Sequence, residues 1–158
     1  MGFFTDKTLM ITGGTGSFGN AVLKRFLDTD IKEIRIFSRD EKKQDDMRKL
    51  YNNTKIKFYI GDALQLIPAL GVTFDLAFVD GDKRKYIEYY EMTLAHLSPG
   101  GYIIADNTLW DGHVLEEPHN NDYQTIGIKA FNELVAHDER VEKVILPLRD
   151  GLTIIRKK

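Results

Sequence analysis

The stretch "KTLMITGGTGSFGNAVLKRFLDTDIKEIRIFS", residues 7–38, decides the fold. It opens with a short apolar run that stops at glycines, continues with apolar residues at helical spacing, and closes in a segment rich in Ile and Phe. That order predicts a strand, a glycine-rich turn, a helix over 17–30 and a second strand over 31–38. Strands that alternate with helices are typical of a parallel sheet covered by helices on both faces.

The same alternation continues to the C-terminus. Further strands are predicted at 55–62, 74–81 and 102–107, helices at 39–53, 63–70, 85–97 and 123–138, and a closing hairpin at 141–148 and 152–158. The "SPGG" stretch at 98–101 is expected to end the helix before it. Right-handed crossovers favour a doubly wound α/β arrangement, and we expect one Rossmann-like domain over residues 1–158 with an antiparallel last strand.

Composition excludes several classes of protein. The chain has 158 residues, a formal net charge of −2 and no cysteine, which argues against nucleic-acid binding, disulfides and zinc–thiolate sites. No apolar run approaches the roughly 18 residues of a membrane span, and the start "MGFFTDK" lacks the apolar segment of a signal peptide. We expect a cytoplasmic protein whose partners are small-molecule nucleotides at most, with no nucleic acid and no membrane; a homodimer stays open.

The glycine-rich turn is typical of phosphate-binding loops. Gly13, Gly16 and Gly19 each suit one task there: a tight turn, close approach of the backbone to a pyrophosphate, and close packing of helix on strand. Thr12, Ser17 and Phe18 complete the loop and begin the helix, whose free N–H groups favour an anion. We predict that these six residues contact a cofactor.

The end of the second strand bears on which cofactor is bound. An acidic residue at this point would hold the ribose hydroxyls of NAD or of S-adenosylmethionine, but the strand ends in Ser38 and Arg39. A cation beside the ribose favours the 2′-phosphate of NADP. Asp40 is the alternative, because it can still take the ribose role.

Residues 3–62 resemble the bacterial UDP-N-acetylglucosamine 4,6-dehydratase/epimerases, which are extended short-chain dehydrogenases. The resemblance covers the segment from "DKTLMITGGTGSFGN" to "KFYIGD" and implies that Asp62 lies beside the adenine. The reactive lysine of that family and its sugar-binding domain have no counterpart. Tyr51 and Lys55 reproduce the Y-x-x-x-K spacing, but they precede the third strand, and we interpret this match as chance.

A second group of polar residues follows the fourth and fifth predicted strands. Asp80 comes directly after the fourth strand, and Asp106 and Asn107 end the fifth. The carboxyl ends of adjacent parallel strands are neighbours. Three oxygen ligands without His or Cys suit Mg²⁺ or Ca²⁺, although each residue alone is also a common turn or capping residue. The sequence therefore predicts a weak metal site at Asp80, Asp106 and Asn107.

From Asp62 to the C-terminus the chain resembles the cation-dependent O-methyltransferases of the caffeoyl-CoA and catechol type. The segments "FDLAFVDGDKRKYIEYYEMTLAHLSPGGYIIADNTLW" and "DGLTIIRKK" carry the resemblance. It implies S-adenosylmethionine as cofactor, Lys83 as the general base and Trp110 near the substrate. The family's own glycine motif, the acidic residue of its second strand and its N-terminal helices are missing.

The two resemblances meet at Gly61–Asp62, which divides the chain into 1–62 and 63–158. Both families share the strand order 3-2-1-4-5, so we expect one seven-stranded sheet in the order 3-2-1-4-5-7-6. The interpretation that follows is an engineered, non-catalytic chimera that retains NADP or nucleotide binding. The alternatives are a weak metal-dependent O-methyltransferase that uses S-adenosylmethionine, with NADP ranked ahead of that cofactor, and a folded scaffold that binds neither.

Overall fold

The computed structural model describes residues 2–158. The strands are β1 (Thr8–Thr12), β2 (Glu33–Ser38), β3 (Ile56–Ile60), β4 (Phe74–Val79), β5 (Leu97–Asp106), β6 (Val141–Leu146) and β7 (Leu152–Lys157). The helices are α1 (Ser17–Leu27), α2 (Glu41–Tyr51), α3 (Ala63–Leu70), α4 (Tyr86–His96) and α5 (Tyr123–His137), with 3-10 turns η1 (Lys83–Lys85) and η2 (Trp110–Leu115). Strand and helix alternate as the sequence predicts.

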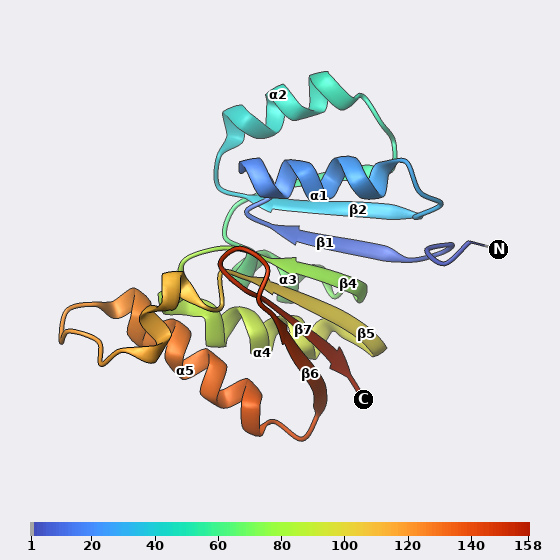
Figure 1. Ribbon diagram of the computed structural model, residues 1–158. Coiled ribbons are helices and arrows are strands. Elements are labelled where there is room, and N and C mark those ends of the chain that lie inside the picture. The colour runs from blue at the N-terminus through green and yellow to red at the C-terminus, as the bar shows by residue number, and fades with distance from the viewer. Residues whose placement is uncertain (1) are drawn as a thin grey trace.

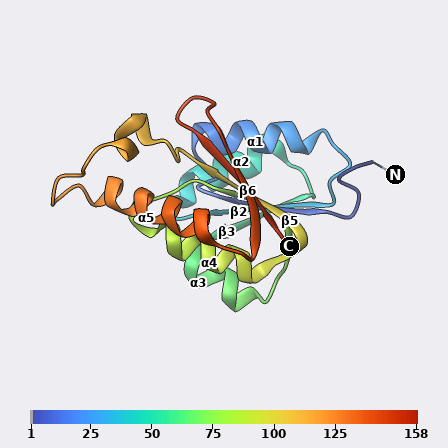
Figure 2. The ribbon, with the colours of Figure 1, turned by 60° about the horizontal axis from the view of Figure 1, so that its bottom comes forward.

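All seven strands form one sheet in the order β3-β2-β1-β4-β5-β7-β6. The first five strands are parallel, and β7 lies antiparallel to both β5 and β6. The α/β Rossmann-like fold, its single domain and its strand order are therefore confirmed. Helices α1 and α2 cover one face of the sheet, and α3, α4 and α5 cover the other (Figures 1 and 2).

Two hydrophobic cores lie on the two faces of the sheet, and β1 contributes to both. Leu9 and Ile11 pack toward α1 and α2 with Leu23 and Met47, whereas Met10 packs on the opposite side with residues of α3, α4 and α5. Successive side chains of a strand point to opposite faces, so a central strand must be apolar throughout. Leu9, Met10 and Ile11 are each fully buried, which fixes β1 in the middle of the sheet.

One strand begins earlier than the sequence predicts. Helix α4 ends just before the "SPGG" stretch, as expected, but β5 begins at Leu97 rather than at residue 102 and runs through these residues. The strand tolerates them because its pairing with β4 is irregular, with a register shift between Phe74 and Leu76. Gly101 also has backbone oxygens where a Cβ would lie, 2.8 Å from Ser98 O and 2.9 Å from Asp75 O.

Parallel pairing brings the carboxyl ends of five strands to one edge of the sheet. β1 lies between β2 and β4, so the chain turns in opposite directions from this strand. In open α/β sheets, ligands bind in the crevice beyond the strand ends at such a switch point. The topology therefore places the glycine-rich loop, the end of β2 and the polar ends of β4 and β5 around one region.

Candidate functional site

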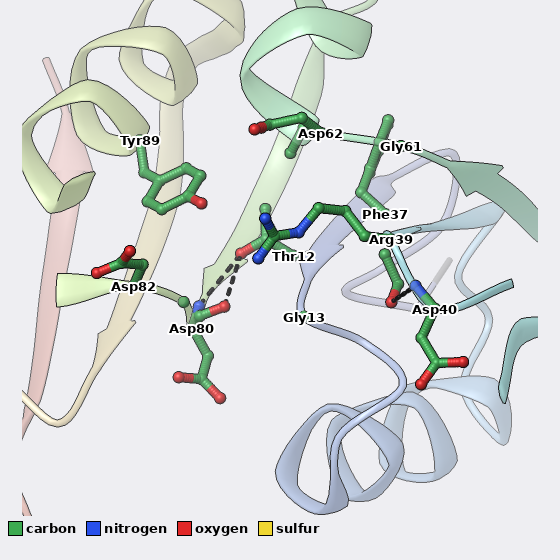
Figure 3. Close-up of a pocket in the computed structure, with 13 residues that line it drawn as sticks. Thr12, Gly13, Phe37, Arg39, Asp40, Gly61, Asp62, Asp80, Asp82 and Tyr89 are labelled. Carbon is green, nitrogen blue, oxygen red and sulfur yellow. Dashed lines mark hydrogen bonds between the residues drawn. The ribbon is translucent and has the colours of Figure 1, made fainter. Parts of the chain in front are cut away.

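A cavity of about 260 Å³ lies at the switch point between β1 and β4. Its walls come from the ends of β1, β2, β3 and β4 and from α4, as Figure 3 shows. Thr12 joins two of these ends: its Oγ accepts a hydrogen bond from Asp80 N at 3.2 Å. The cavity is thus built on strand ends, whose positions the sheet fixes.

The glycine-rich loop passes very close to the end of β4. Gly13 has φ +62°, and a Cβ at this position would lie 2.6 Å from Asp80 O. Gly19 has the same constraint, because its Cβ would lie 2.6 Å from Gly14 Cα, where α1 meets the loop. Gly16 is the N-cap of α1, and no side chain caps this helix. The glycines therefore permit close packing of loop, helix and strand.

The end of β2 presents a cation to the cavity. The Arg39 side chain projects into the space bordered by Thr12, Asp62 and Tyr89 (Figure 3). Asp40 does not offer a free carboxylate, since it caps α2 by accepting a hydrogen bond from Lys43 N at 2.9 Å. Ser38 Oγ is hydrogen-bonded to Thr15 Oγ at 2.9 Å. At the end of β2, the cavity is therefore bordered by an arginine and not by a free carboxylate, as the sequence predicts.

Asp62 lies across the cavity from Arg39. It caps α3, with its carboxylate accepting a hydrogen bond from Leu64 N at 3.0 Å, and Lys85 Nζ lies 3.8 Å from its other oxygen. Tyr89 reaches the same cavity from α4, and burial raises the pKa of its hydroxyl. This side of the cavity is thus bordered by one aromatic ring and by a carboxylate held in place by the helix start.

Lys83 lies at the centre of the second polar group. Its side chain is buried, and its Nζ lies 3.5 Å from Asp80 Oδ1, 3.1 Å from Asn107 Oδ1 and 3.2 Å from Asp106 O. The hydroxyl of Tyr86 contacts the same nitrogen and also donates a hydrogen bond to Asp106 O at 2.8 Å. Oxygen atoms from the ends of both β4 and β5 therefore surround the Nζ of Lys83.

Burial and mutual repulsion set the charge of this group. Burial lowers the pKa of Lys83, although Asp80 and Asp106 oppose that shift. Burial also raises the pKa of the Asp106 carboxyl, and the negative charges of Asp80 and Asp150 add to the effect. A carboxylate that is half-buried beside other carboxylates is stabilised by a cation.

Carboxylate and amide oxygens of this kind are the ligands that a hard divalent cation prefers. Asp80 Oδ1 and Asn107 Oδ1 already surround the ammonium of Lys83, and Asp106 is the neighbouring carboxylate with the raised pKa. Among residues 2–158, no group of three or more His, Cys, Asp or Glu side chains is placed to hold a metal. The set that fits contains two aspartates and an asparagine, and it stays a prediction.

A second cavity, of about 590 Å³, adjoins this polar group. Its walls are the start of α1, the ends of β4 and β5, and the turn between β6 and β7. Asp80 lines both cavities, whereas Asp106 and Asn107 line the second. Asp80, Asp106 and Asn107 therefore lie where the two cavities meet.

The predicted cofactor residues divide between these spaces. Thr12, Gly13, Ser38, Arg39 and Asp62 line the first cavity, and Ser17 and Phe18 line the second. Gly16 and Gly19 are not among the described lining residues of either; they shape the loop and the helix start. Four further residues lie at the site without any signal in the sequence, because only folding brings them there: Tyr86, Tyr89, Arg149 and Asp150.

Backbone strain concentrates around the polar group. Asn107, Trp110, Asp111 and Arg149 all have positive φ, between 49° and 58°, without being glycine. Non-glycine residues in this region cost free energy and cluster at functional sites. The turn that carries Arg149 is tied to the β5 end by the hydrogen bond from Leu109 N to Asp150 O, at 2.9 Å.

Comparison with known proteins identifies the larger part of the chain. The sequence model described as O-methyltransferase matches residues 38–158. An O-methyltransferase from Bacillus cereus in complex with SAH superposes with a TM-score of 0.84 and 27% identity, over 96% of this chain and 74% of that one. An SAH-bound methyltransferase from Podospora anserina gives 0.81 and 26%, over 96% and 72%.

A different family matches a shorter stretch. UDP-glucose 4-epimerases of Rickettsia prowazekii and Rickettsia rickettsii are 78% identical over 63 residues, or 37% of this chain. The chain spans 18% of the length of these curated relatives. The presence of two resemblances agrees with the sequence analysis, but the comparisons support neither a dehydratase nor an engineered origin. In the part of the chain that the structure describes, no helix is long and apolar enough to cross a membrane.

The comparisons correct the functional interpretation. A non-catalytic domain with residual NADP or nucleotide binding is the wrong interpretation, because the matching family is that of O-methyltransferases and the two solved methyltransferases named above have SAH bound. The ranking of NADP above S-adenosylmethionine is wrong for the same reason. A family match over residues 38–158, together with the fold of the whole sheet, shows that the chain belongs to the O-methyltransferase family.

Proposed function

We propose that the chain transfers a methyl group from S-adenosylmethionine to a hydroxyl oxygen of an aromatic diol. The observation that carries this proposal is the position of Asp80, which lines both the cavity at the β1–β4 switch point and the cavity beside Asp106 and Asn107. Methyl transfer needs a donor and an acceptor that meet at one point. The two cavities supply a space for each and share one wall.

The first cavity suits the adenosine end of the cofactor. Asp62 and Tyr89 border it, and the glycine-rich loop approaches closely at Gly13. The uncapped start of α1, which lines the second cavity, has no acidic residue in its first turn and suits the methionine carboxylate of a donor that extends past Asp80. Arg39 stands where a ribose-binding carboxylate is absent, so we expect weak rather than tight cofactor binding.

The second cavity suits the acceptor. Asp80, Asp106 and Asn107 would hold Mg²⁺ or Ca²⁺, and the ion would supply Lewis-acid chemistry that lowers the pKa of a phenol. Lys83 would take the hydroxyl proton, since burial lowers the pKa of its ammonium and its Nζ lies next to Asp80 and Asn107, which line the second cavity. The oxygen then bonds to the methyl carbon, and the carbon–sulfur bond breaks with its electron pair on sulfur, which leaves S-adenosylhomocysteine.

Two measurements on the same protein test this proposal. Titration calorimetry measures S-adenosylhomocysteine binding, and mass spectrometry follows methylation of a catechol with S-adenosylmethionine and Mg²⁺. We expect both binding and a mono-methylated product, with the product lost in Lys83→Met and retained in Lys24→Met, an exposed lysine of α1. Absence of both binding and product would instead support the scaffold that binds neither cofactor. The partners that we propose are thus the cofactor and a small acceptor; homodimerisation stays a prediction.

A further inference from the structure

The turn between β6 and β7 places a cation at the rim of the acceptor cavity. Arg149 lines this cavity together with Leu148 and Asp150, opposite Phe18 at the start of α1. Its side chain is exposed, and among the described residues it forms no hydrogen bond or ion pair, unlike most arginines of the chain. A guanidinium without a partner beside a cavity is a ready binder of carboxylate or phosphate.

The backbone at Arg149 gives a second, independent observation. Its φ is +54°, a conformation that glycine adopts without cost, and the two residues that follow it are held by hydrogen bonds from the segment after β5. Thr108 N donates to Gly151 O at 3.1 Å, and Leu109 N donates to Asp150 O at 2.9 Å. The turn therefore holds a large charged side chain in a strained position at the rim, which is typical of a functional residue.

The charges around the cavity leave Arg149 as the cation among its described lining residues. Asp80, Asp106 and Asp150 are the carboxylates. A divalent ion together with Arg149 would balance these three carboxylates, since Lys83 is uncharged when it acts as the base, so the cavity would not repel an anion at Arg149. The remaining walls, at Phe18, Ala21, Leu148 and Leu152, are apolar and suit an aromatic ring.

We infer that Arg149 selects acceptors that carry a carboxylate on the aromatic ring, away from the diol. The inference rests on the proposed function, because it takes the acceptor site to be the cavity beside Asp106 and Asn107. Arg149 pairs with the carboxylate at the rim, the apolar walls hold the ring, and the diol faces the polar group. This arrangement makes Arg149 a specificity residue rather than a catalytic one.

The test compares two acceptors that differ only in charge. Ligand-observed NMR titration with Mg²⁺ measures the dissociation constants of 3,4-dihydroxybenzoate and of its neutral amide, 3,4-dihydroxybenzamide. We expect the parent chain to bind the carboxylate about tenfold more tightly, the size of one charged hydrogen bond. Arg149→Gly should remove this preference, and Arg149→Lys should keep part of it.

Arg149→Gly is a sharp variant because glycine suits the φ of +54°, so the turn keeps its backbone. Unfolding by urea should show this variant to be as stable as the parent chain. Equal binding of the two acceptors by the parent chain, no binding of either, or a preference that survives Arg149→Gly would each overturn the inference. A lost methylation reaction with an intact carboxylate preference would overturn the proposed function alone.

Discussion

The close approach of the glycine-rich loop to β4 makes Gly13→Ala the most informative substitution. The added Cβ would lie 2.6 Å from Asp80 O, which is backbone and cannot turn aside, and φ is +62°. The left-handed conformation costs an alanine about 1 kcal/mol, and overpacking of this kind adds about 1–3 kcal/mol. We therefore expect Gly13→Ala to lower the free energy of unfolding by about 2–4 kcal/mol.

The chain offers a matched control for this prediction. Gly71, which ends α3, has φ +58° and nothing within 4 Å of its hypothetical Cβ. Gly71→Ala therefore carries the same backbone cost without the collision, and we expect a loss of about 1 kcal/mol. The difference between the two variants measures the close approach itself.

Urea unfolding followed by circular dichroism measures both variants, and thermal unfolding gives a second estimate. For a domain of this size, Tm should fall by about 2–4 °C in Gly71→Ala and by about 4–16 °C in Gly13→Ala. Gly13→Ala should also weaken S-adenosylhomocysteine binding, since relief of the collision moves Asp80. Equal losses of stability in the two variants would refute the claim that the loop is packed against the end of β4.

Three further predictions concern the cofactor, the metal and pH. Ser38→Glu supplies the missing carboxylate at the end of β2 and should tighten S-adenosylhomocysteine binding about tenfold by calorimetry; an equal gain from Ser38→Gln would argue against a charge effect. Asp106→Asn should raise the Mg²⁺ concentration needed for methylation at least about tenfold, and EDTA should stop the reaction in the parent chain; activity indifferent to both would exclude the metal site. Hydrogen bonds from Arg140 and Tyr90 hold the pKa of Asp138 well below its ordinary 3.8, so this carboxylate stabilises the fold above about pH 4 and loses its effect as pH falls further. Asp138→Asn should thus be less stable than the parent chain in urea by about 1 kcal/mol or more at pH 7, with a smaller difference at pH 3; a constant difference would contradict this linkage.

The absence of an acidic residue at the end of β2 explains why the sequence favours NADP, which the comparisons do not support. Local comparison of Ser38 and Arg39 with nucleotide-binding proteins points to a 2′-phosphate, because a cation stands where ribose hydroxyls would be held. Cofactor choice depends on every wall of the cavity and not on one strand end. These walls also include Tyr89 of α4 and Asp80 after β4.

The sequence by itself determined the fold. Alternating strand and helix patterns, and the fully apolar "LMI" of β1, are local signals whose physical cause is burial, so they can be read one segment at a time. The proximity of Asp80, Asp106 and Asn107 can also be predicted from the sequence, because parallel strands end at one edge of the sheet. Their convergence on Lys83 follows from that topology.

Only the tertiary structure decided what surrounds those residues. Arg149 is 66 residues from Lys83 in the sequence, and it reaches the cavity beside Asp106 and Asn107 because β7 inserts between β5 and β6 in the sheet. The rings of Tyr86 and Tyr89 point toward the site because α4 packs with that face against the sheet. Contacts of this kind depend on the register and packing of distant segments, for which no local pattern of residues carries a signal.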